Sequence, residues 1–182
     1  MTETKLDGQT VYEGRVITVR KDTVRMPDGS AAVREVVSSS GAAVVLPVNG
    51  KGEAVLVRQY RYAAGSLLLE APAGKLEKGE DPRACAAREL KEETGYSSGR
   101  MVSLGTIYSS PGVFDEQLHL FLALDLTCGD SCPDEGEFIE TVHMPLEALT
   151  RDIMRGKIRD AKTVAIILMA NEFLKGNKYR AE

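Results

Sequence analysis

The 182-residue sequence predicts an α/β domain with a mixed β-sheet, preceded by a small antiparallel β ribbon. Three observations support this prediction. Residues 1–40 carry strand patterns alone, residues 41–182 combine apolar strand-like runs with helical patterns, and the length fits one domain with a small appendage. We therefore expect a ribbon at 1–40 and the main domain at 41–182.

The ribbon is predicted from β-branched residues in Thr10–Arg20 and Thr23–Met26, followed by a turn and a returning strand at Ala31–Val37. The turn is Pro27-Asp28-Gly29-Ser30, a combination of residues that strongly favours chain reversal. Because an isolated hairpin is only marginally stable in water, the ribbon must pack on the rest of the chain or on a partner chain.

The main domain begins with Ala42–Val48, a nearly continuous apolar run typical of a buried central strand. A turn at 49–52 leads into a second such strand, Ala54–Tyr60. The remaining predicted strands are Leu67–Ala71, Val102–Tyr108, Leu118–Leu126 and Phe138–Met144.

The clearest predicted helix is Pro82–Thr94, with Asp81 as its N-cap, a proline in its first turn and Gly95 in the left-handed C-terminal position. Two more helices are expected at Leu146–Arg155 and Thr163–Leu174.

The composition, with 43% hydrophobic and 27% charged residues, is that of a soluble globular protein. A net charge of −4 argues against a nucleic-acid or membrane partner, although a local arginine cluster could still hold a phosphate. No apolar run approaches the roughly 20 residues of a membrane span, and the N-terminus has no signal-peptide pattern. Three cysteines without a Cys-x-x-Cys pair predict no disulfide and a cytoplasmic location.

Three glutamates of the first helix share one stripe. At 100° per residue, Glu93 lies about 40° from Glu89, and Glu92 lies about 60° to its other side. These carboxylates repel one another, and a hard divalent cation such as Mg²⁺ or Mn²⁺ would neutralise them. The alternative is a solvated acidic face, which spacing alone does not exclude. The neighbouring apolar face, predicted to dock on the sheet, comprises Ala86, Ala87 and Leu90, while Cys85 and Ala86 leave room beneath the stripe.

The stretch from Gly74 to Tyr96 resembles the Nudix box, a glycine followed at set spacings by glutamates, an arginine and a second glycine. The matching residues are Gly74, Glu80, Arg88, Glu89, Leu90, Glu92, Glu93 and Gly95. The resemblance implies a Nudix-type α/β/α sandwich and a hydrolase acting on nucleoside diphosphates. It also implies that Glu89, Glu92, Glu93 and the Ala73 carbonyl bind metal, with Glu92 also catalytic, and that Gly74, Glu80, Arg88 and Gly95 have structural roles.

Features outside the box resemble the ADP-ribose pyrophosphatase branch of this family, beginning with Pro111 about fifteen residues beyond it. The other similar segments are 24–29, 58–61, 70–74, 136–140 and 160–163. The implied reaction is hydrolysis of ADP-ribose to AMP and ribose 5-phosphate. The implied general base comes from an acidic loop after the box, with Glu137 as first choice and Glu135 as second.

The same resemblance suggests substrate contacts. Arg61 is the candidate for a phosphate or ribose, and Glu70, Pro111 and Gly112 lie in the matching segments. Adenine would stack on the ribbon, on Arg34, Tyr12 or another residue, in a homodimer that exchanges its ribbons. Taken singly, each residue also has a plain structural explanation, such as a solvated charge or a simple turn.

Two alternatives to ADP-ribose hydrolysis remain. One is a hydrolase for another nucleotide sugar, such as GDP-mannose, because sister enzymes share the box. The other is a Nudix domain that only binds ADP-ribose as a sensor, against which the intact glutamates weigh.

Overall fold

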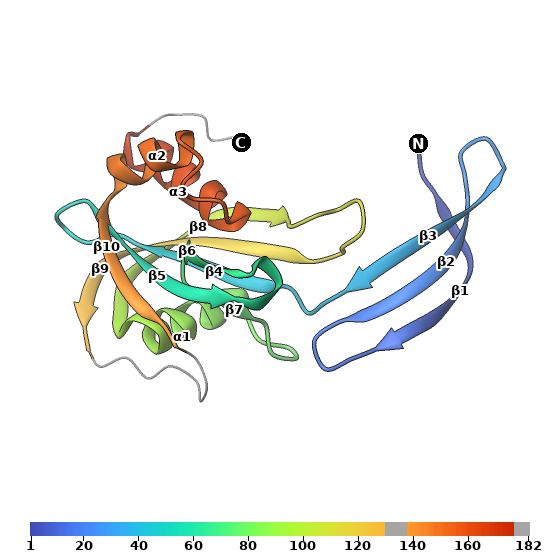
Figure 1. Ribbon diagram of the computed structural model, residues 1–182, viewed down its shortest axis with the longest axis horizontal. Helices are drawn as coiled ribbons and strands as arrows, with labels where there is room; N and C mark the ends of the chain where they lie inside the picture. Colours follow the sequence, from blue (N-terminus) through green and yellow to red (C-terminus); the bar gives the residue numbers. More distant parts are fainter. Residues whose placement is uncertain (130–137, 177–182) are drawn as a thin grey trace. The chain divides into compact units, whose positions relative to one another are not determined.

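The computed structural model describes residues 1–129 and 138–176. The chain forms two compact units, Met1–Gly41 with Tyr108–Gln117, and Ala42–Ile107 with Leu118–Glu182. Figure 1 shows their strands and helices, and each unit is described by itself.

The N-terminal unit is a three-stranded antiparallel sheet in the order β1-β2-β3. Its strands are β1 (Thr4–Glu13), β2 (Thr18–Arg25) and β3 (Ala31–Ser38). The β-branched stretch Thr10–Arg20 is divided between two strands, because the chain turns between β1 and β2, where Gly14 N–H donates to Ile17 O at 2.9 Å. β-branched residues on both sides of this turn conceal it in the sequence.

The larger unit contains two sheets, with strand orders β7-β4-β9-β8 and β10-β5-β6. The strands are β4 (Ala42–Pro47), β5 (Glu53–Arg61), β6 (Ser66–Glu70), β7 (Ala73–Lys75), β8 (Tyr96–Tyr108), β9 (Gln117–Cys128) and β10 (Glu140–Pro145). β4 pairs with β9 in parallel and with β7 antiparallel, which confirms the predicted mixed sheet. β7 was not predicted, since three residues after a proline are too few to show a pattern.

Helices cover both faces of β4, and they are α1 (Pro82–Thr94), α2 (Leu146–Met154) and α3 (Ala161–Leu174). Val44 and Leu46 belong to the core cluster that α2 and α3 complete, whereas Ala43 and Val45 pack in a second cluster with residues of α1. Figure 1 shows α1 on one side of these strands and the other two helices on the opposite side. The domain is therefore an α/β/α sandwich, as predicted.

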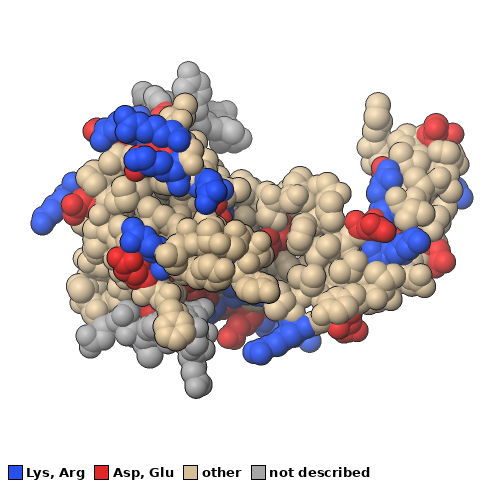
Figure 2. Space-filling view, viewed as in Figure 1, with Lys and Arg blue, Asp and Glu red and all other residues tan. Residues whose placement is uncertain are grey.

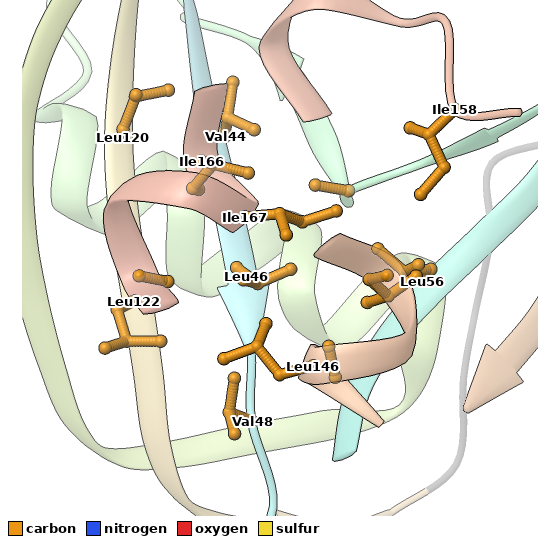
Figure 3. Close-up of a cluster of buried hydrophobic side chains, with 14 of the residues drawn as sticks. Val44, Leu46, Val48, Leu56, Leu120, Leu122, Leu146, Ile158, Ile166 and Ile167 are labelled. Carbon is orange, nitrogen blue, oxygen red and sulfur yellow. The ribbon is translucent and has the colours of Figure 1, made fainter. Parts of the chain in front are cut away.

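The larger of the two clusters brings together strands and helices that are far apart in the sequence. Figure 3 shows Leu46 among Leu122 of β9, Leu146 of α2 and Ile167 of α3. All but Leu146 are completely buried. One prediction about α1 is wrong: Ala87 is exposed, and Cys85 joins Ala86 and Leu90 on the sheet-facing side.

None of the helices within the described ranges has the length and apolar character needed to span a membrane.

Candidate active site

The helix α1 begins and ends as its sequence predicts. Asp81 Oδ1 accepts hydrogen bonds from the backbone N–H groups of Arg83, at 2.9 Å, and Ala84, at 3.1 Å. Gly95 closes the helix at φ 76°, and its N–H donates to Lys91 O. These caps satisfy backbone groups that the helix itself leaves unpaired, so the frame carrying the glutamates is well defined at both ends.

Arg88 lies at the centre of the acidic stripe. Its Nη1 donates to Glu89 Oε1 at 2.6 Å and to Glu92 Oε2 at 3.0 Å. Its other nitrogens bond Glu80, with Nε donating to Oε1 at 3.1 Å and Nη2 to Oε2 at 3.2 Å. One guanidinium thus offsets the repulsion among three carboxylates, two of which belong to the predicted metal ligands.

This network shifts the ionisation of its members. The hydrogen bonds from Arg88 and from the Glu77 backbone hold the pKa of Glu80 at about 2, well below its usual range. The same bond with Glu80 is the main reason that the pKa of Arg88 is raised. Burial raises the pKa of the Cys85 thiol to about 11, so this side chain stays a neutral thiol beneath the stripe. Glu80 and Arg88 therefore remain an ion pair throughout the physiological pH range.

Gly74 of β7 lies directly against Glu89. A methyl group on Gly74 would lie 2.5 Å from Glu89 Oε2 and would overlap the rest of the carboxylate. With the Glu89 carboxylate in this position, the close approach of β7 to α1 leaves no room for a side chain at residue 74. The presence of glycine at the first position of the box thus has a steric explanation, the contact with Glu89, which the spacing of the motif does not reveal.

Glu93 connects the helix with the backbone of the same strand. It is 6% exposed, and its Oε2 accepts a hydrogen bond from Ala73 N at 3.3 Å. Cys85 approaches β7 one turn earlier, with Sγ 3.5 Å from Lys75 O and 3.7 Å from Gly74 O. The fold therefore brings the predicted ligand residues Ala73 and Glu93 together. Their position in the sequence does not reveal this contact, because they lie on different elements.

The donor set suits a hard divalent cation, because it offers carboxylate oxygens from one helix face and backbone carbonyls from the adjoining strand. Within residues 1–129 and 138–176, no three His, Cys, Asp or Glu side chains already converge as a metal cluster. Arg88 holds Glu89 and Glu92 to its own nitrogens. The side chains fit a cation chemically and would need to turn from Arg88 to surround one.

A second charged cluster lies at the end of β6. Glu70, which is 1% exposed, accepts hydrogen bonds from Arg61 Nε and Nη2, both at 2.8 Å, and from Lys162 Nζ at 2.5 Å. Lys162 Nζ also lies 3.0 Å from Asp160 Oδ2. The sequence predicts Arg61 and Glu70 as substrate contacts, whereas it assigns Lys162 no role. The only signal for Lys162 was its place in the similar segment 160–163.

Three more of the predicted substrate residues meet in the N-terminal unit. Arg34, Pro111 and Gly112 line one open hollow of about 490 Å³ together with Tyr108 and Phe114. Arg34 is paired with Glu3, to which its Nε donates at 2.9 Å and its Nη2 at 2.6 Å. Tyr12 does not line this hollow but lies on β1, 57% exposed.

The two acids predicted as general bases, Glu135 and Glu137, lie outside the described residues. The adjoining Phe138 is 90% exposed and Glu140 of β10 pairs with Arg58 at 2.9 Å.

Comparison with known families agrees with this architecture. Residues 39–165 match the NUDIX domain model, and residues 3–37 match that of the nucleoside diphosphate sugar hydrolase N-terminal domain. The first match covers well over half of the chain and includes α1 with all of its glutamates. The chain therefore belongs to the Nudix family, and it is a Nudix hydrolase.

The chain is similar to several individual proteins over most of its length. An ADP-ribose pyrophosphatase from Bacillus subtilis is 37% identical, over 98% of both chains. A methanol dehydrogenase activator from Bacillus methanolicus is 38% identical, over 95% of this chain and 96% of its own. A GDP-mannose pyrophosphatase from Cronobacter sakazakii is 38% identical over 70% of this chain and 71% of its own. The crystal structure of an ADP compounds hydrolase superposes with a TM-score of 0.84 at 26% identity, covering 99% of this chain and 98% of that one.

Proposed function

We propose that the protein hydrolyses the diphosphate linkage of ADP-ribose to AMP and ribose 5-phosphate, using Mg²⁺ or Mn²⁺. The observation that carries the proposal is the stripe of Glu89, Glu92 and Glu93: Arg88 binds the first two, and the third accepts a hydrogen bond from the backbone of β7. Cleaving a diphosphate requires neutralising its charge, and oxygen ligands on a rigid helix are suited to hold the cations that do so.

The metal ligands would be the three glutamates and the Ala73 carbonyl. A bound divalent cation would supply charge neutralisation at the phosphates and lower the pKa of an attacking water. Arg61 would hold the diphosphate, for which a guanidinium with two parallel N–H donors is suited. A carboxylate of the loop after β9 would take the proton of the water, with Glu137 preferred to Glu135.

The choice of ADP-ribose is supported by the extent of the similarity. The ADP-ribose pyrophosphatase matches along 98% of this chain, ribbon included, whereas the GDP-mannose pyrophosphatase matches along 70%. The adenine would occupy the hollow of the N-terminal unit, where Arg34 offers a planar cation for stacking and Pro111 and Gly112 form the rim.

A panel of nucleotide sugars tests the proposal. With Mg²⁺ or Mn²⁺ present, ADP-ribose should have the highest kcat/KM, and AMP and ribose 5-phosphate should appear in equal amounts. Glu93→Gln should nearly abolish turnover at fixed metal, whereas Glu140→Gln, which alters only a surface ion pair, should leave it unchanged. GDP-mannose ranking first would replace the proposed substrate, and binding of ADP-ribose without turnover of any substrate would favour a sensor.

We also propose that the protein is a cytoplasmic homodimer that exchanges its ribbons. All ten residues of β1 are exposed, and the large apolar side chains among them include Leu6 at 47% and Val11 at 54%. Figure 2 shows that tan surface predominates over the ribbon, at the right of the view, among scattered charges. Light scattering should give about twice the chain mass of 19.8 kDa, and Val11→Glu should shift it to the monomer. A monomeric wild-type protein would refute the exchange.

A further inference from the structure

The charged cluster at the end of β6 has a defined centre, the carboxylate of Glu70. Both oxygens are used: Oε1 accepts from Arg61 Nε, and Oε2 accepts from Arg61 Nη2 and from Lys162 Nζ. The side chain is 1% exposed, so these partners replace the water that a carboxylate would otherwise need. Two cations therefore share one buried anion.

Lys162 is held from its other side as well. Its Nζ lies 3.0 Å from Asp160 Oδ2, and its side chain is 15% exposed. Asp160 is itself fixed as the N-cap of α3, where its side chain accepts from Thr163 N at 3.0 Å. The ammonium group is thus built into the start of the helix and directed at Glu70, in contrast to the usual solvated lysine.

Arg61 differs from Lys162 in being partly open to solvent. Its side chain is 42% exposed, although Nε and Nη2 are held on Glu70. A guanidinium has five N–H donors in a planar fork, so the bidentate pair leaves three of them for another ligand. Among the described residues, Arg61 Nη1 has no hydrogen-bond partner. One edge of the fork is anchored and the opposite edge remains available.

The same segment that carries Glu70 also reaches the glutamate helix. Ala71 N donates to the buried Thr163 Oγ1 at 2.8 Å, and Ala73 N donates to Glu93 Oε2 at 3.3 Å. The negative charge of Glu93 is also among the causes that raise the pKa of Arg61, after its hydrogen bond with Glu70. Arg61 therefore lies within the electrostatic field of the predicted metal ligands, on a backbone tied to both clusters.

We propose that Lys162 and Glu70 are positioning residues, which hold the Arg61 guanidinium with its open edge toward the diphosphate of the substrate without touching the substrate themselves. The proposal rests on the proposed function, in which Arg61 contacts the diphosphate. An arginine side chain has large rotamer freedom, and fixing it before binding removes an entropic cost of association. Lys162 contributes by fixing the Glu70 carboxylate that receives the guanidinium.

A double-mutant cycle between Lys162 and Arg61 tests this role. Lys162→Met should raise KM by about 10-fold and change kcat by less than about 3-fold, because the loss is in preorganised binding. In an Arg61→Ala background, the same substitution should change KM by less than about 2-fold, since the residue that it positions is gone. Lys162→Arg, which keeps a donor for Glu70, should restore most of the lost affinity.

Lys157→Met is the matched control. Lys157 also pairs with an aspartate, Asp152 at 3.1 Å, but it is 61% exposed and is not a partner of Glu70, so the KM of Lys157→Met should equal that of the wild type. Equal effects of Lys162→Met with and without Arg61 would overturn the proposal, because Lys162 would then act on its own. An unchanged KM in Lys162→Met would also overturn the proposal. If that variant fails to fold, Glu70→Gln takes its place in the same cycle with the same expectations.

The cycle is measured on the nucleotide sugar that the wild type cleaves fastest. If that is GDP-mannose, the proposed substrate fails while the positioning role is still tested, because the diphosphate is common to both. If ADP-ribose ranks first and the cycle is additive, the positioning role alone fails. If nothing is cleaved, the dissociation constant of ADP-ribose replaces KM, and ADP-ribose that does not bind would overturn the role of Arg61 as well.

Discussion

The contact between Gly74 and Glu89 makes a sharp prediction for Gly74→Ala. The new methyl group would lie 2.5 Å from Glu89 Oε2, where ordinary van der Waals contact begins at 3.4 Å. The Glu89 carboxylate must therefore retreat by about 1 Å or more, and a misplacement of that size costs about 100-fold in rate, or about 2.7 kcal/mol of transition-state stabilisation. Overpacking costs about 1–3 kcal/mol of stability, and we expect the lower end because a flexible side chain gives way.

The measurement is steady-state hydrolysis of the best substrate together with urea unfolding. We expect kcat/KM to fall about 100-fold while the free energy of unfolding falls by about 1 kcal/mol. Gly50→Ala is the control, because a methyl group there meets nothing within 4 Å. A Gly74→Ala enzyme within 3-fold of wild-type activity would refute the reasoning, since Glu89 would then not need the space beside β7 that Gly74 leaves open.

Three further predictions concern stability and reactivity. The pKa of Glu80 is lowered to about 2, so its bonds with Arg88 stabilise the fold above about pH 4.5 and this contribution is lost as the pH falls toward 2; the stability difference between wild type and Glu80→Gln should therefore shrink from pH 5 to pH 2 in urea unfolding, and a constant difference would contradict the linkage. Leu46→Ala, in the completely buried core, should cost about 2–5 kcal/mol, whereas Leu67→Ala, 63% exposed, should cost less than about 0.5 kcal/mol, as urea unfolding at pH 7 would show. Cys85, buried with its pKa raised to about 11, should resist alkylation by iodoacetamide at pH 8 until the protein is unfolded, as peptide mass spectrometry would detect, and rapid native labelling would show that the site opens.

Local features of the glutamate helix were predictable because their causes lie within a few residues. Asp81 and Gly95 cap α1 as predicted, since a cap depends on the side chain and backbone at the helix end alone. The stripe of three glutamates follows from helical spacing in the same way. Helical spacing does not fix which apolar residues are buried: Ala87 is exposed because the direction of the sheet decides which residues near the edge of an apolar face become buried.

The sequence by itself determined the family, through the box, and the alternation of strands and helices that produces an α/β/α sandwich. Only the tertiary structure decided which residues from distant segments meet. Lys162 reaches Glu70 across 92 positions of the chain, and Gly74 meets Glu89 because β7 pairs with β4 beside α1. Such contacts depend on strand pairing and helix packing, which bring together residues that no local pattern relates. The box therefore identifies the hydrolase, and the folded chain shows how its glutamates and the charges around Arg61 are held.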